Sequence, residues 1–234
     1  MRSLLDIPSN GIIHENIPGI YEPQYVYREN TISEVMLDDR DMAIWKILVD
    51  KGMQNAFHGL SELLNHTITL DTLQIEQMPV NDVLLLSGTP DSNGVGVYMS
   101  IDDYIDAQLL LTYTPEVAYR FIDIMLKLPP GTTNVLGDIE WHALKDIGNI
   151  TGSYFLNTLA DNTGLMFLPS PPEVVVDSIY SIMRIPMTSI TMSNKDALLV
   201  KASFSSENQE LEGTFLALPT TDVIKAVTKR IDFN

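Results

Sequence analysis

One order of elements, predicted twice along the chain, constrains the fold of these 234 residues more than any other feature. Helix, strands, hairpin and helix are expected over about residues 39–130 and again over about 134–232. At one common offset, Asp50 aligns with Asn149 and Leu60 aligns with Leu159. Neither copy could readily bury one face of a sheet alone, so we expect the two copies to share one β-sheet about a pseudo-two-fold axis. The predicted fold class is a single α/β domain of the α+β kind.

The individual elements are predicted from hydrophobic spacing and from turn residues. Amphipathic spacing, with proline or glycine near the ends, indicates four helices, at about 39–65, 114–128, 134–161 and 219–231. Short apolar runs indicate strands at about 68–70, 82–86, 94–99, 105–111, 174–176, 197–202 and 211–218. Turn residues are found at 90–94, and a hairpin tip is expected at 205–210. Small residues in the middle of the first helix predict close contact with another element.

Residues 1–35 differ from the rest of the chain. Pro8, Pro18 and Pro23 interrupt them, and neither a helical nor an alternating hydrophobic period persists. We therefore expect an irregular N-terminal arm over 1–35, with part of it packed onto a domain over 36–234.

Composition excludes several classes of function. The chain has no cysteine, and no two of its four histidines have the i, i+4 spacing of a helical metal pair, so no metal site of its own is expected. A formal net charge of −17 argues against nucleic acid, and against an anionic membrane surface, as partners. The sequence has no apolar run near the roughly 20 residues of a spanning helix and no signal-peptide pattern. We expect a cytoplasmic protein without membrane insertion.

The predicted helix at about 134–161 carries the most informative residues. Its expected core stripe, at steps of three and four, is Leu136, Ile139, Ala143, Ile147, Ile150 and Tyr154. The opposite face presents Asp138, His142, Lys145, Asp146 and Asn149. Spacings of i, i+4 and i, i+3 project His142, Asp146 and Asn149 together. An ordinary solvated helix face has the same spacing, so spacing alone assigns no chemistry to these residues.

Two strings of residues carry a family resemblance. The later string is Leu144-Lys-Asp-Ile-Gly-Asn-Ile150, and Pro172 follows Asn149 after 22 intervening residues. The earlier string is Asn55-Ala-Phe-His-Gly-Leu-Ser61. The later string resembles the second signature of the CheC/CheX/FliY family of chemotaxis phosphatases, Asp/Ser-x3-Glu-x2-Asn-x22-Pro, and the earlier string resembles the first signature. The resemblance covers about residues 40–231 and implies the two-repeat, CheC-like fold.

The resemblance also implies where the functional residues lie. Each half of a family member can carry a Glu-x-x-Asn pair. In the first half the aligned residues are Ile47 and Asp50, and an isoleucine cannot pair with a charge, so this site is expected to be degenerate. In the second half the pair is Asp146 and Asn149, with His142 at the family's Asp/Ser position. One modified site is therefore expected.

The activity implied by the resemblance is hydrolysis of the phospho-aspartate of a CheY-type response regulator. Asn149 would orient the attacking water, and Asp146 would contact a lysine of the regulator. His142, Lys145 and Pro172 are expected to contact the partner. No cofactor of the chain's own is expected, because the Mg²⁺ of this chemistry belongs to the regulator.

Two other functions are compatible with the same residues. A catalytically impaired, CheC-like chain could serve as an adaptor that binds the receptor deamidase CheD or phosphorylated CheY, or as a flagellar-switch module related to the FliM middle domain. A cleft between the halves could also bind a small ligand, although the sequence has no Gly-rich phosphate loop. We favour the phosphatase over the adaptor. The sequence leaves the choice between a monomer and a homodimer open.

Overall fold

A computed structural model describes residues 37–79, 82–83, 92–102, 107–190, 196–207 and 211–231. The chain divides into two units, Met1–Glu34 and Val35–Asn234, and the fold below is that of the second. The expected N-terminal arm, residues 84–86 of one expected strand and part of the expected turn at 90–94 lie outside the described residues.

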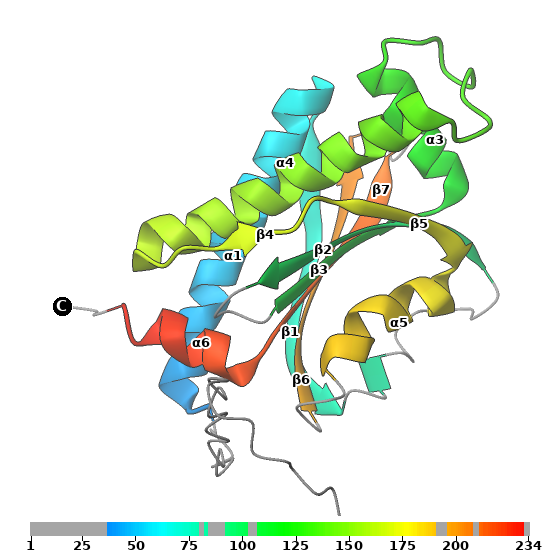
Figure 1. Ribbon diagram of the computed structural model, residues 1–234. Helices are drawn as coiled ribbons and strands as arrows, with labels where there is room; N and C mark the ends of the chain where they lie inside the picture. The colour runs from blue at the N-terminus through cyan, green and yellow to red at the C-terminus, as the bar shows by residue number, and fades with distance from the viewer. Residues whose placement is uncertain are drawn as a thin grey trace, which may run out of the picture. The chain divides into compact units, whose positions relative to one another are not determined.

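The described elements follow the order of the two predicted copies (Figure 1). The helices are α1 (Asp39–Leu64), α3 (Pro115–Met125), α4 (Asp138–Thr163), α5 (Ile179–Ile190) and α6 (Thr221–Thr228). The strands are β1 (Ile68–Pro79), β2 (Asn93–Asp102), β3 (Ala107–Tyr113), β4 (Leu168–Pro169), β5 (Glu173–Ser178), β6 (Asp196–Ser206) and β7 (Glu212–Pro219).

The seven strands form one sheet in the order β1-β6-β7-β3-β2-β4, with β5 also paired to β2. All the pairings are antiparallel. The strand order has the symmetry expected of two related halves. Along the path β1-β6-β7-β3-β2-β5, the strands β1, β2 and β3 of the first half occupy the places that β5, β6 and β7 of the second half occupy when the path is followed from its other end. Each half therefore completes the sheet of the other, and the α+β prediction is confirmed.

The two faces of the sheet bury separate clusters of side chains. The larger core lies between the sheet and α1, α3, α4 and α6 and includes Trp45, Phe57, Phe155 and Phe215. The smaller cluster lies under α5, where Ile182 and its neighbours pack against side chains of β3, β6 and β7. Figure 1 shows α5 on the side of the sheet away from α4. The long helices α1 and α4 thus belong to one layer.

Helices α1 and α4 pack against each other in opposite directions. Near one end of the contact, Lys51 Nζ donates to Asn162 Oδ1 at 3.1 Å, and near the other, Tyr154 Oη donates to Glu62 Oε2 at 3.2 Å. A Cβ atom on Gly59 would lie 2.7 Å from the ring of Tyr154. The small residues of α1 therefore mark a close helix contact, as the sequence predicts.

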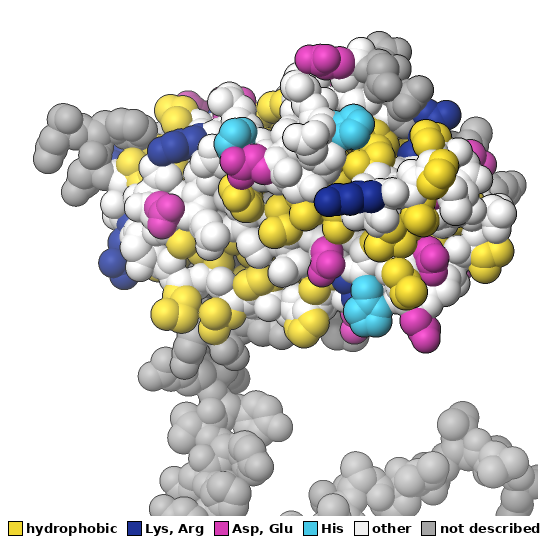
Figure 2. All heavy atoms as spheres, turned by 90° about the horizontal axis from the view of Figure 1, so that it is seen from above, with side chains coloured by type: hydrophobic (Ala, Val, Ile, Leu, Met, Phe, Trp, Pro, Cys, Tyr) yellow, Lys and Arg dark blue, Asp and Glu magenta, His cyan; other side chains and the backbone are white. Residues whose placement is uncertain are grey.

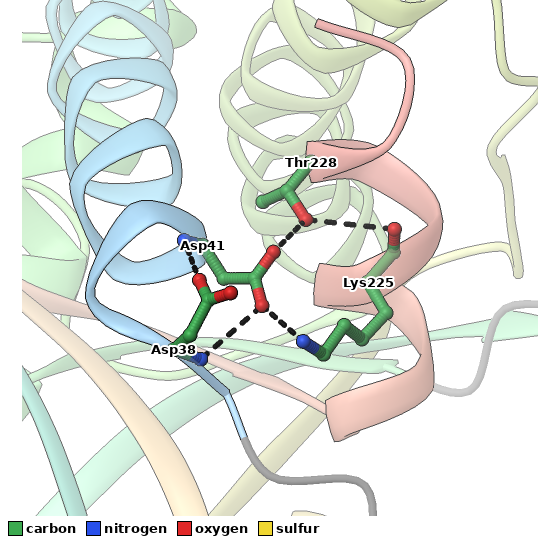
Figure 3. Close-up of polar contacts among 4 residues, drawn as sticks. All are labelled: Asp38, Asp41, Lys225 and Thr228. Carbon is green, nitrogen blue, oxygen red and sulfur yellow. Dashed lines mark hydrogen bonds and ion pairs between the residues drawn. The ribbon is translucent and has the colours of Figure 1, made fainter.

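A buried carboxylate joins the start of α1 to the C-terminal helix (Figure 3). The carboxylate of Asp41 accepts hydrogen bonds from Thr228 Oγ1 at 2.6 Å, from the Lys225 ammonium, and from the Asp38 backbone amide at 3.2 Å. Burial raises the pKa of the Asp41 carboxyl, but the hydrogen bonds from Lys225, Thr228 and Asp38 outweigh burial and lower it to about 2. Asp41 and Asp38 also form a capping box at the start of α1.

Two secondary-structure predictions are wrong. Asp82 and Val83 were expected to begin a strand but are helical, and no helix was expected at Ile179–Ile190, where α5 lies. Apolar residues of α5 recur at helical spacing, but Pro186 inside the helix conceals the pattern. Helix α5 follows β5, and residues 82–83, which follow β1, are also helical.

The start of α4 also differs from the prediction. The helix begins at Asp138, not near residue 134, because the preceding loop is held in another conformation. The buried carboxylate of Asp123 accepts hydrogen bonds from the amides of Gly131, Thr132 and Thr133 at 2.7–3.2 Å. Burial raises the pKa of Asp123, but these bonds dominate and the pKa is lowered.

Within the described ranges, none of the helices combines the length and the apolar character that crossing a bilayer requires.

Candidate active site

Helix α4 turns a stripe of small and apolar side chains toward the sheet and α1. The buried positions include Ala143, Leu144, Ile147, Gly148, Thr151, Gly152, Phe155, Leu156 and Leu159. A Cβ atom on Gly148 would lie 2.4 Å from Val97 Cγ1, and one on Gly152 would lie 2.5 Å from Met99 Cε. The two glycines therefore let α4 lie directly on β2.

The predicted core stripe of α4 is wrong in part. Ala143 and Ile147 are buried as expected, but Ile139 is 65% exposed, and Ile150 and Tyr154 are only half-buried. The prediction followed the large apolar residues, whereas glycine and threonine fill the stripe that faces the sheet. As a result, the buried face of α4 is rotated by about one residue around the helix axis relative to the predicted core stripe.

The polar face of α4 is exposed, as the sequence predicts. Asp138, His142, Lys145, Asp146 and Asn149 all reach solvent. Among the described residues, neither the Asp146 carboxylate nor the Asn149 carboxamide has a hydrogen-bonding partner. Because the two are three residues apart on one helix, their side chains project from the same face. A free carboxylate and a free carboxamide are thus presented side by side to whatever approaches α4.

His142 is held by its own helix. Its Nδ1 atom lies 2.5 Å from the carbonyl oxygen of Asp138, and a carbonyl only accepts, so Nδ1 carries the proton. This bond leaves Nε2 as the ring atom available to a partner. Lys145 is exposed next to Asp146, and its expected contact with a partner stays a prediction.

Pro172 lies against α4 next to the candidate pair. A Cβ atom on Gly148 would be 3.6 Å from Pro172 Cβ, and Gly148 directly precedes Asn149. The stretch before Pro172 is fixed to β2, because the Ser170 amide donates to the Ser100 carbonyl at 2.7 Å and the Ser170 hydroxyl accepts from the Ser100 amide at 3.1 Å. The fold thus brings together residues that the sequence separates.

The first half presents a different surface at the aligned positions of α1. Ile47 is 57% exposed, and the Asp50 carboxylate accepts a hydrogen bond from Gln54 Nε2 at 2.8 Å. Asn55, from the first signature, donates to Thr158 Oγ1 at 2.9 Å and so contributes to the α1–α4 contact. In the first half, the exposed Ile47 therefore replaces the charged residue of the pair. The hydrogen-bonded carboxylate of Asp50 replaces the carboxamide.

One positioning residue escaped the sequence analysis. Asp123 fixes the loop that leads into α4, through three backbone amides, and so sets where the candidate helix begins. The only sequence signal is an aspartate a few residues before Pro129-Pro-Gly131-Thr-Thr133, which is too general a pattern to assign. Within the described part of the chain, no three acidic or histidine side chains gather in a way that could hold a metal ion.

Comparisons with known proteins give relatives in sequence and in fold. No protein-family model matches the chain. The CheY-P phosphatase CheC of Bacillus subtilis (strain 168) is 22% identical over 190 residues, which cover 80% of this chain and 91% of that protein.

Two solved structures share the fold over most of their length. FliY of Thermotoga maritima superposes with a TM-score of 0.60 at 18% identity and covers 84% of this chain and 97% of its own. The FliM middle domain of H. pylori superposes with a TM-score of 0.58 at 14% identity and covers 83% of this chain and 100% of its own.

Proposed function

We propose that this chain, a CheC-like protein of the chemotaxis family in sequence and fold, hydrolyses the phospho-aspartate of a CheY-type response regulator through Asp146 and Asn149. The predicted CheC-like resemblance is confirmed. The observation that supports the activity is the exposed pair on α4, whose side chains have no hydrogen-bonding partner among the described residues. The resemblance aligns this pair with the family's Glu-x-x-Asn signature. The predicted cytoplasmic location, the possible partner CheD and the oligomeric state stay predictions.

In the proposed reaction, water attacks the phosphorus of the acyl phosphate in line with the bond to the aspartate. The bond between phosphorus and the aspartate oxygen breaks, the carboxylate leaves, and the oxygen and both protons of the water become part of inorganic phosphate. The regulator's own Mg²⁺ and lysine neutralise charge on the phosphoryl oxygens. The Asn149 carboxamide can accept from the water through its oxygen and donate through its nitrogen, and so fixes the water without carrying charge.

Asp146 would anchor the helix to the regulator through a cationic side chain of the partner. It keeps the negative charge of the family's glutamate but is one methylene shorter, a loss of about 1.5 Å in reach. A misplacement of this size can cost about 100-fold in rate. The proposal therefore includes an activity below that of an otherwise equal site with glutamate.

The decay of a regulator phosphorylated with acetyl phosphate tests the proposal. We expect the wild-type chain to shorten the lifetime of the phosphoryl group and Asn149→Ala to remove this effect. Asn157→Ala is the matched control, because Asn157 is exposed two turns further along the same helix. Equal rates for wild type and Asn149→Ala would refute the mechanism.

A CheC-like adaptor is the alternative that specific observations favour. The aligned pair of the first half is Ile47 and Asp50, and the FliM middle domain of H. pylori has the same fold. An adaptor would bind CheD or the phosphorylated regulator with no change in phosphate lifetime. Binding by wild type and by Asn149→Ala alike, with unchanged decay in both, would support this function over the phosphatase.

A further inference from the structure

We propose that Ile139 and Val135 form the apolar part of the surface through which the response regulator docks onto α4, an inference that rests on the proposed function. Ile139 lies at the N-terminal end of the face that carries Asp146 and Asn149, and Val135 lies in the loop that leads into this end of α4. They would contribute binding, while Asn149 would contribute the chemistry.

Both aliphatic side chains are unusually open to solvent. Ile139 is 65% exposed and Val135 is 70% exposed. Single exposed aliphatic residues are common on protein surfaces and need no explanation. Val135 lies in the loop three residues before α4 begins, whereas Ile139 lies in the first turn of the helix. Ile139 precedes His142 by three residues and Asp146 by seven, which puts it on the polar face of the helix.

The size of a protein interface places Ile139 inside the contact area. A helix rises 1.5 Å per residue, so the Cα atoms of Ile139 and Asn149 are about 15 Å apart. A standard interface covers about 800 Å² on each partner, which is a patch of about 16 Å radius. A regulator that receives the Asn149 side chain next to its phosphoryl group must cover the surrounding surface, and an interface of ordinary size reaches Ile139.

The surface on the two sides of Asn149 differs in chemistry. Toward the C-terminal end of α4, Ser153 and Tyr154 are half-buried and Asn157 is polar. Toward the N-terminal end, Ile139 supplies exposed apolar area on the helix, and Val135 supplies more in the loop that precedes it. In Figure 2, hydrophobic side chains reach the surface at several places among scattered charged ones. Burial of apolar area from water is the main gain on association, so the N-terminal side is where docking gains most.

Charge indicates the chemistry of the occupant. Acidic Asp138 and Asp146 accompany Ile139 on this face, with Lys145 as the basic member of the group. The chain as a whole has a net charge of −17. A partner that fits this face presents cationic side chains next to an apolar patch, and the acidic surface would speed its encounter at low salt.

Kinetics with a matched pair of variants test this surface. Ile139→Ala and Ile47→Ala remove the same atoms from two exposed isoleucines on the two long helices. We expect Ile139→Ala to raise KM for the phosphorylated regulator about tenfold, with kcat within twofold of wild type, because it removes apolar contact area and no reacting group. Val135→Ala should act in the same direction, and Ile47→Ala should leave both constants unchanged.

The possible outcomes separate the two proposals. If wild type accelerates decay and Ile139→Ala has an unchanged KM, the docking surface is wrong and the phosphatase stands. If wild type neither accelerates decay nor binds the phosphorylated regulator, both proposals fail. An equal rise of KM in Ile47→Ala would also overturn the docking surface, because the effect would not depend on the half that carries Asn149. Since both side chains are exposed, an unchanged unfolding midpoint controls for folding.

Discussion

Gly52 of α1 lies so close to Phe155 of α4 that a Cβ atom on Gly52 would come within 2.8 Å of the ring carbon Cδ2. Both residues are buried in the layer formed by the two long helices. The absence of a side chain at Gly52 thus allows the helix that carries the candidate site to pack against its counterpart in the other half. A larger residue would force the helices apart.

We therefore expect Gly52→Val to lower the free energy of unfolding by about 1–3 kcal/mol through overpacking against Phe155. Urea denaturation measures the change. Valine has a higher helix propensity than glycine, so a loss of stability can be assigned to the contact with Phe155 and not to the helix itself. An unchanged or higher free energy of unfolding would show that the contact yields at little cost.

The bonds of Asp41 to Lys225 and Thr228 predict a stability difference that depends on pH. The folded pKa of about 2 lies below the ordinary aspartate pKa of 3.8, so the stabilisation is present above about pH 4 and is lost as pH falls toward 2. Asp41→Asn should lower stability at pH 7 by about 1–2 kcal/mol, a value reduced to allow for solvent screening. Unfolding midpoints of both proteins between pH 7 and pH 2.5 should converge, and a constant difference would contradict the prediction.

Asp146→Glu should raise kcat/KM for dephosphorylation, because it restores the reach of the family's carboxylate toward the regulator. The expected gain is up to about 100-fold, and a smaller gain would mean that the docked helix already shifts to compensate. The same substitution combined with Asn149→Ala should give no gain. A decrease in the Asp146→Glu single variant would show that the regulator-facing geometry is adapted to aspartate.

The dependence on Mg²⁺ should belong entirely to the regulator. Thermal unfolding of the isolated chain should be the same with Mg²⁺ and with EDTA, whereas dephosphorylation should stop when EDTA removes the regulator's metal. A midpoint that rises with Mg²⁺ concentration would contradict the expectation that the chain has no metal site of its own.

The sequence predicted the polar face of α4 correctly and its core face only in part. Charged and amide side chains at helical spacing can be placed on a solvent face without knowledge of the fold. The buried face depended on Gly148, Thr151 and Gly152, which pack closely against the sheet but carry little hydrophobic signal. That error put Ile139 in the core, although it is exposed on the face of the candidate site.

The sequence by itself determined the two-copy order of elements, the four principal helices and the alignment of Asp146 and Asn149 with a family signature, because periodicity and motif spacing are local properties of the chain. Only the tertiary structure decided that Pro172 lies next to α4, that α5 covers the second face of the sheet, and that Asp41 joins α1 to α6. These relationships join residues that are distant in sequence, and they follow from how the two halves bury a shared sheet, which no short window of sequence contains.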